Sequence, residues 1–377
     1  MAKHLKLEEL MIFALERDFK PALSESYISR YFLLKDKLYR EFLTWIRANE
    51  PMLSDHGPDH IDNVLDNAYQ LLGRELDNLS SKDETIARYK GIDLYFLCTT
   101  ILFHDVGNFY QRKYHNENIQ FVINNTFSDF FYNQFNREKN LIIAAGRAHS
   151  GKENEDTLKN ISETEHSAGH EIKLQEIAAI VRLADELAEG PQRTCKYMSS
   201  AGKITPESEI YHRYAECTHL KIDAKNGRIN IAYDIYLDVN ENQVMPDAER
   251  EKLKELLEFI HKRVFKLDQE RKYCGYYCDT LKSIKETQVS FSFYNQGILI
   301  DFKLNPLILT DLTVPGDNAK SIVEGRTDLE IDTVVGNLDA ALSGMSLQPK
   351  ISCGEPVVSI PPDESRNWFS KLLGAKK

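Results

Sequence analysis

Histidine is concentrated in one part of the chain. Seven of the eleven histidines lie between His56 and His170, in a stretch that is also rich in acidic residues. Imidazole and carboxylate groups together are the usual ligands of divalent metals of hard or intermediate character. The distribution therefore indicates a metal site in this segment, and the local context of each residue shows which side chains are suited to form it.

His60 is expected in the first turn of a helix. Pro58 suits the first helical position, and the acidic Asp59 suits a helix N-terminus. Apolar residues then recur at helical spacing over residues 61–72. This context places His60 beside the buried face of the helix, either as a metal ligand or as a histidine that is hydrogen-bonded at the helix start.

The pair His104-Asp105 follows a very apolar run. Residues 92–103 are apolar on nearly every side, which predicts a helix at the centre of the core. His104 and Asp105 come directly after this helix, and Gly107 permits a sharp turn. Polar side chains at the end of a buried helix are costly unless they are hydrogen-bonded or bind an ion.

Asp185 completes the predicted ligand set. It lies one turn beyond Val181, close to the inward face of a helix over residues 177–188. Taken alone it would be an acid paired with Arg182, three residues away. Taken together, the four residues predict a site for a divalent cation such as Mn, Fe, Co, Ni, Mg or Zn, with the ligands His60, His104, Asp105 and Asp185.

The order and context of these residues resemble the HD superfamily of metal-dependent phosphohydrolases. The similar phrases are HGPDHI from His56, LFHDVG up to Gly107 and RLADEL from Arg182, and the resemblance covers residues 56–193. The same phrases are similar to HD proteins of bacterial nucleotide-signalling and conflict systems. The resemblance implies an HD-type helical bundle, a divalent metal bound by the four residues above, and a role in antiviral defence.

The resemblance also implies roles for residues around the metal. Asp105 is expected to be both ligand and water-orienting base, and His149 to bind a second metal or contact phosphate, with a surface histidine as the alternative. His115 and Glu117 lie where several HD nucleotide hydrolases carry a general acid or a second-metal ligand. The residues expected to contact the substrate are His56, Lys113, Arg147, Arg182 and Arg193.

The predicted substrate is a small nucleotide, with (deoxy)nucleoside triphosphates first, hydrolysed by attack of water on phosphorus. The formal net charge of −11 disfavours an extended nucleic acid, whose binding depends on clustered Lys and Arg. The chain lacks the GHGPFSH run typical of HD dNTP triphosphohydrolases and the Gly-Tyr-Pro motif of cyclic-di-GMP phosphodiesterases. Two alternatives stay open: a metal-dependent nuclease or phosphodiesterase on DNA, RNA or cyclic nucleotides, and a non-catalytic nucleotide-sensing or partner-binding module.

The expected fold is mainly α, with an HD-type helical bundle core and a C-terminal α+β elaboration. Residues 1–50 are expected to form two helices that pack on the core, the second over residues 26–48. Residues 51–215 are expected to form the HD core without strands, and His166 and His170 are interpreted as a solvated helix start within it.

The elaboration is expected over residues 216–305. Alternating apolar and polar residues predict one hairpin around Asn226-Gly227 and another around Gly297, the latter with a strand over residues 298–304. Between them a long helix from Asp247 carries an apolar stripe, which could serve as intrachain core or as the contact of a homo-oligomer. Residues 306–377 give no clear pattern, and a partner protein is expected to bind through this C-terminal region.

The overall composition predicts a globular protein. The 377 residues are 42% hydrophobic and 28% charged, as in globular proteins, and no run is long enough for a membrane span or a signal peptide, so a cytoplasmic location is expected. The six cysteines are too dispersed for a disulfide framework, and Cys274 and Cys278 are interpreted as ordinary helix residues. Residues 366–373 are expected to form a short amphipathic helix that docks on the body, on a partner or on a membrane.

Overall fold

The structure, a computed structural model, describes residues 4–49, 57–110, 112–131, 135–151, 155–167, 169–194, 205–239, 244–311 and 326–344. Two predictions fall outside these ranges. They are the substrate contact of His56 and the amphipathic helix over residues 366–373.

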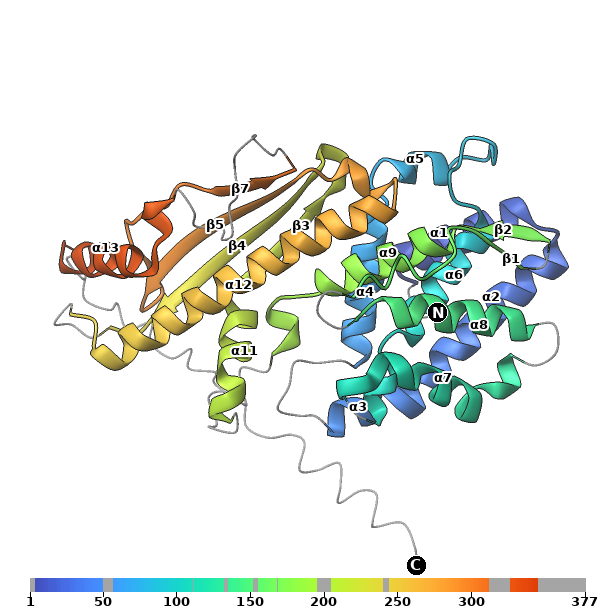
Figure 1. Ribbon diagram of the computed structural model, residues 1–377, viewed down its shortest axis with the longest axis horizontal. Coiled ribbons are helices and arrows are strands. Elements are labelled where there is room, and N and C mark those ends of the chain that lie inside the picture. The colour runs from blue at the N-terminus through green and yellow to red at the C-terminus, as the bar shows by residue number, and fades with distance from the viewer. Residues whose placement is uncertain are drawn as a thin grey trace, which may run out of the picture. The chain divides into compact units, whose positions relative to one another are not determined.

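Helix α6 (Gly91–Phe103) is the centre of the helical half of the chain. Every one of its residues is buried, as the apolar sequence predicted. The helices that pack against it are α1 (Lys6–Asp18), α2 (Pro21–Leu38), α4 (Pro58–Leu71), α8 (Asn136–Ala148) and α9 (Leu174–Glu186). A further helix, α7 (His115–Thr126), packs beside α8 (Figure 1). The predicted helical bundle is confirmed.

The second N-terminal helical run, Pro21–Asn49, is longer than predicted and is interrupted by a π turn. It begins at Pro21, the first helical position that proline favours, rather than at residue 26. A π-helical turn, η1 (Tyr39–Leu43), then joins α2 to α3 (Thr44–Asn49). A π turn rotates the residues that follow it relative to the preceding apolar stripe, and 60% of Trp45 is exposed to solvent.

The prediction that the HD core contains no strands is wrong. A two-stranded antiparallel ribbon, β1 (Glu165–Ser167) and β2 (His170–Ile172), stands in place of the expected helix start. Gly169 adopts the positive φ of 82° at its turn. His166 lies exposed on this ribbon, while the ring of His170 packs edge-on against Phe19 with centroids 4.7 Å apart.

A mixed sheet forms the C-terminal module. The predicted first hairpin is confirmed as β3 (Thr218–Asp223) and β4 (Arg228–Leu237), with Gly227 at a positive φ of 75°. β4 also pairs in parallel with β5 (Glu286–Asn295) along its whole length. Parallel neighbours need a crossover connection, and the long helix α12 (Asp247–Tyr277) provides it.

The second hairpin is shorter than predicted. Strand β6 covers only Ile298–Leu299 and pairs with the last two residues of β5, whereas the sequence predicted a strand to residue 304. The first residues of β5 pair instead with β7 (Leu307–Thr310). Part of the segment 306–377, for which no regular element was predicted before residue 366, is thus regular, because β7 and α13 (Ile331–Gly344) both fall within it.

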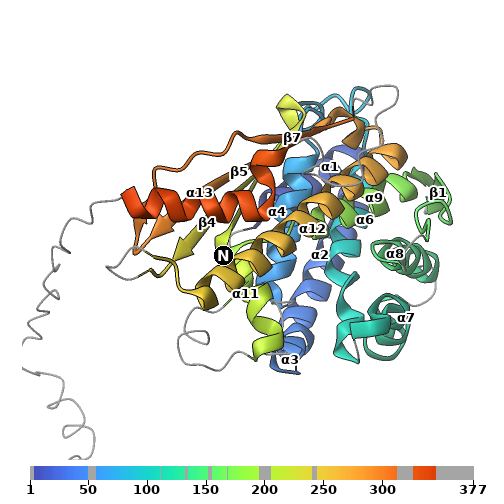
Figure 2. The same ribbon diagram turned by 60° about the vertical axis from the view of Figure 1, so that its left-hand side comes forward.

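Helix α12 lies along one face of the sheet (Figures 1 and 2). Its apolar stripe is buried within the chain, so the stripe serves as intrachain core; the buried positions are Leu253, Leu256, Leu257, Ile260, Val264 and Leu267. The helix also contacts α9 and α11 (Pro206–Cys217), so it reaches the helical half. All of these elements belong to one compact unit, Met1–Ser343. Among the described residues, no helix is long and apolar enough to cross a membrane.

The burial of α12 can be tested by truncation. Leu257, 1% exposed, should lose about 2–5 kcal/mol of unfolding free energy when replaced by alanine, because the buried side chain leaves a cavity. Urea unfolding of the Leu257→Ala variant measures the loss. Lys262→Ala, on the same helix with 79% of its side chain exposed, should change the stability by less than about 0.5 kcal/mol. Equal effects of the two substitutions would contradict the assignment.

Candidate metal centre

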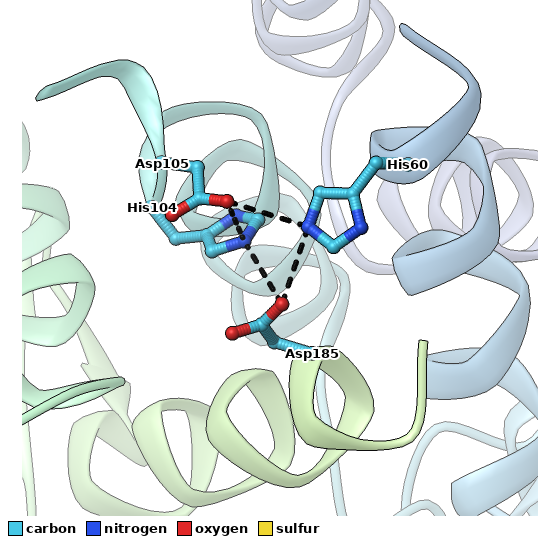
Figure 3. A group of neighbouring side chains, drawn as sticks. All are labelled: His60, His104, Asp105 and Asp185. Atoms are coloured by element: carbon cyan, nitrogen blue, oxygen red, sulfur yellow. Dashed lines mark ion pairs between the residues drawn. The ribbon is translucent and has the colours of Figure 1, made fainter. Parts of the chain in front are cut away.

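Three helices bring the four predicted ligands together (Figure 3). His60 lies in the first turn of α4, whose first residue is Pro58, as the sequence predicted. His104 ends the buried helix α6 and Asp105 follows it, while Asp185 comes from the last turn of α9. Because α4 and α9 both pack against α6, these three helix ends meet at one point.

The donor atoms of the four side chains converge. Nε2 of His60 lies 3.4 Å from Oδ2 of Asp105 and 3.2 Å from Oδ1 of Asp185. Nε2 of His104 lies 3.5 Å and 3.6 Å from the same two oxygens. All four donor atoms lie within 4.8 Å of one another. Both histidine side chains are fully buried while 26% of the Asp185 side chain is exposed, so the cluster is open to solvent on the Asp185 side.

This donor set fits a divalent metal. The Nδ1–H of His104 donates to the carbonyl oxygen of Ile101 over 2.7 Å, a contact that assigns the tautomer and directs the Nε2 lone pair into the cluster. That buried Nε2 atom faces the carboxylate oxygens of Asp105 and Asp185. Two imidazoles and two carboxylates around one point are suitable ligands for a transition metal, whose charge offsets the cost of burying them.

The electrostatics of the metal-free cluster are dominated by mutual attraction. Burial alone would raise the pKa of Asp185, but hydrogen bonds from His104 and His60 outweigh it and hold this pKa well below its ordinary value. Burial alone would lower the pKa of His104, but the carboxylates of Asp105 and Asp185 outweigh it and raise this pKa to about 9. Without a metal, a proton on His104 therefore balances part of the negative charge.

A second cluster shares Asp105 with the first. The other oxygen of this carboxylate, Oδ1, lies 3.6 Å from Nε2 of His115 and 3.7 Å from Nε2 of His149, and the two histidine Nε2 atoms are 3.1 Å apart. The Nδ1–H of His149 donates to the carbonyl oxygen of Gly146, which leaves Nε2 for the cluster. These three side chains could hold a second metal ion next to the first.

Gly107 allows His115 to approach Asp105. A Cβ atom at position 107 would lie 1.8 Å from the main-chain oxygen of His115, so no larger residue fits without movement of the backbone. This close contact joins the 3₁₀ turn η2 (Val106–Phe109) to the start of α7. A turn at Gly107 was expected from the sequence. The structure shows a second reason for a glycine at this position, the close approach of the His115 main chain.

A main cleft of about 360 Å³ opens onto both clusters. On the side of the metal centre it is lined by Asp105, His115, His149 and Asp185. Its other wall comes from α11 and α12 and includes an aromatic group, Tyr211, Tyr214 and Phe259. The centre therefore lies at the inner end of a cleft whose outer wall belongs to the C-terminal module.

A side cleft of about 680 Å³ adjoins the main one. It lies along α7 and α8, and His115, Ser150 and Gly151 line both clefts. Oγ of Ser150 is 3.4 Å from Nε2 of His115. The two clefts therefore meet at the second cluster.

The other predicted site residues line one or the other of these clefts. Arg182 and Arg193 line the main cleft, whereas Lys113, Glu117 and Arg147 line the side cleft. The guanidinium of Arg182 is bound by the carboxylate of Glu270 through contacts of 2.7 and 2.8 Å. Glu117 thus lines a different cleft from the one onto which the first cluster opens.

The wall formed by α11 and α12 was not predicted from the sequence. On α12 the lining residues Arg263, Lys266 and Glu270 recur at helical spacing, and this polar stripe beside the apolar one was the available signal. Arg263 pairs with Glu189 and, at 2.9 Å, with Glu186, which follows Asp185. Lys266 also pairs with Glu186, at 3.0 Å. These ion pairs attach α12 to the end of α9.

The fold and the donor set together define a metal-dependent hydrolase of the HD type. Residues 50–266, more than half of the chain, match the HD-CE family. The chain therefore belongs to the HD-CE family, which narrows the resemblance seen in the sequence. No curated protein and no solved structure matches the chain.

The shared carboxylate predicts how metal content should respond to substitution. Asp105→Ala should reduce bound metal at both clusters, because each uses one oxygen of this side chain. His149→Ala should reduce only the second ion. Metal analysis by mass spectrometry after loading with Mn or Ni measures both effects. An Asp105→Ala protein with the metal content of the wild type would contradict this arrangement.

The raised pKa of His104 predicts a pH dependence for the metal-free protein. Its folded pKa of about 9 lies above the ordinary value of 6.5, so protonation stabilises the fold fully below about pH 6.5, and this stability is lost as the pH rises through 9. In chelator-treated protein the unfolding free energy should fall by an amount on the order of 3 kcal/mol over this range, and this fall should be absent in His104→Gln. Urea unfolding at pH 6.5, 8 and 9.5 measures it, and metal affinity should rise over the same range because the metal displaces this proton. Parallel pH profiles for the two proteins would refute the assignment.

Proposed function

We propose that this HD-type hydrolase is a nucleotide phosphohydrolase, which catalyses attack of water on phosphorus with a (deoxy)nucleoside triphosphate or a related small nucleotide as substrate. The observation that carries the proposal is the shared Asp105 carboxylate, which joins two candidate metal clusters at the inner end of a solvent-accessible cleft. Divalent cations at such sites lower the pKa of coordinated water and polarise phosphoryl oxygens.

The side chains around the cleft have complementary tasks in this proposal. Asp105 orients the attacking water and accepts its proton. Burial lowers the pKa of His149, so this histidine is neutral near pH 7 and the lone pair of its Nε2 is available to a second metal ion. His115, the other histidine of the second cluster, is 20% exposed at the junction of the clefts, so a phosphate group can approach it.

The charges and aromatic groups of the clefts support a small phosphorylated substrate. Arg193 in the main cleft, and Lys113 and Arg147 in the side cleft, are proposed to contact phosphate oxygens, whereas Arg182 is held by Glu270 in the wall of the main cleft. Tyr211, 48% exposed, offers a face for a nucleobase. The net charge of −11 opposes binding of a long polyanion.

The cytoplasmic location, a role in antiviral defence, and binding of a partner protein or a second copy belong to this proposal as well. They rest on the sequence and on its resemblance to conflict-system proteins.

A substrate panel tests the proposal. Purified protein loaded with Mn, Co or Ni should hydrolyse at least one class among dNTPs, NTPs, monophosphates and cyclic nucleotides. Asp105→Asn should abolish turnover, and His149→Ala should lower kcat by at least about 10-fold because the second cluster loses a ligand. His166→Ala, which removes an exposed histidine of the β1–β2 ribbon, is the matched control and should retain full activity.

The same panel separates the alternatives. Cleavage of labelled single-stranded DNA or RNA without nucleotide turnover would replace the proposal by a nuclease. Thermal stabilisation by a nucleotide without any product would indicate a sensing module. Turnover that survives Asp105→Asn would place the chemistry elsewhere.

A further inference from the structure

The two clefts differ in how their positive charges are neutralised. In the main cleft, Arg263 and Lys266 pair with Glu186, and Arg182 is bound by both oxygens of Glu270. Salt-bridged side chains of this kind mainly hold the wall together, because a ligand must first displace the carboxylate.

The cations of the side cleft have neutral neighbours instead. Nη2 of Arg147 donates to Oε1 of Gln120 at 2.9 Å and to the main-chain oxygen of Glu117 at 3.3 Å. The ammonium of Lys113 lies 5.4 Å from the ring centroid of Tyr114. Neither residue forms a salt bridge within the described parts of the chain, and both are exposed. Their charge is therefore available to an anionic ligand.

The connection between the clefts places these cations within reach of a ligand bound in the main cleft. His115 and Ser150 line both spaces, and His115 is 3.6 Å from the Asp105 carboxylate. A ligand with one part in the main cleft can therefore pass the second cluster and continue into the side cleft. The group of Tyr211, Tyr214 and Phe259 lies on the main-cleft side of this junction, and Lys113 and Arg147 lie on the other.

We infer that the side cleft is a polyphosphate subsite, in which Lys113 and Arg147 bind the phosphate groups distal to the one under attack. This inference rests on the proposed function and makes the substrate a nucleoside polyphosphate, with its base against Tyr211 and its phosphate chain crossing the junction at His115. Glu117 on the same wall suits the Mg²⁺ that accompanies such a chain, since proteins commonly hold this ion through a carboxylate together with substrate phosphates.

Discrimination between nucleotides of different phosphate number tests the subsite. The kcat/KM ratio of a nucleoside triphosphate to the matching monophosphate should fall about tenfold in Lys113→Ala and in Arg147→Gln, mainly through KM for the triphosphate, because each loses a charge-assisted contact. A tenfold loss corresponds to about 1.4 kcal/mol. Arg137→Gln, an exposed arginine on the same helix as Arg147 and outside both clefts, and Lys262→Ala are the matched controls.

Binding of inorganic tripolyphosphate provides a readout that does not depend on turnover. Calorimetry on chelator-treated protein should show binding that weakens about tenfold in Lys113→Ala and Arg147→Gln and is unchanged in Arg137→Gln. Binding that needs both cations, in a protein that hydrolyses no nucleotide, would support the subsite while removing the proposed function. Nucleotide hydrolysis that depends on Asp105, with the triphosphate preference and tripolyphosphate binding unaltered in both variants, would overturn the subsite and leave the proposed function intact.

Discussion

The carboxylate of Asp105 is the group on which the arrangement of the site depends. It is 4% exposed, and each of its oxygens is directed toward a different pair of histidines. A buried carboxylate in this position is stable only if opposite charge or hydrogen-bond donors surround it. The positions of α4, α7 and α8 around the end of α6 supply them, because His60, His115 and His149 lie at the ends of these helices.

The same requirement explains why the surrounding backbone is so constrained. The fully buried helix α6 fixes the position of the Asp105 backbone. The close approach of the His115 main chain to Gly107 fixes the distance between His115 and the Asp105 carboxylate. Hydrogen bonds from the Nδ1 atoms of His104 and His149 to main-chain carbonyls orient both rings. Rigid helix termini, rather than mobile loops, therefore set the geometry of the centre.

The centre was predictable from sequence to the extent that its signals are local. His60 follows a helix-start proline, and His104 and Asp105 follow a run that is apolar on all sides, so each could be placed from its neighbours. The contribution of α12 to the cleft was not predictable in this way. Its polar stripe reaches the cleft only because the parallel pairing of β4 and β5 positions the helix. The β1–β2 ribbon escaped detection because strands of three residues are too short to show an alternating pattern. The division of the cations between two clefts depends on ion pairs between α9 and α12, which lie far apart in the sequence.

The parallel pairing of β4 with β5 has a consequence for the order of folding. The ligands of the centre lie between His60 and Asp185, whereas the β4–β5 ladder can form only after β5 has been made, up to Asn295. During synthesis the N-terminal parts of a chain fold first. We therefore expect the ligands of the centre to assemble before the outer wall of the main cleft. During synthesis, metal uptake would precede substrate selectivity, because the wall of the main cleft that α12 contributes is positioned only once β4 and β5 have paired.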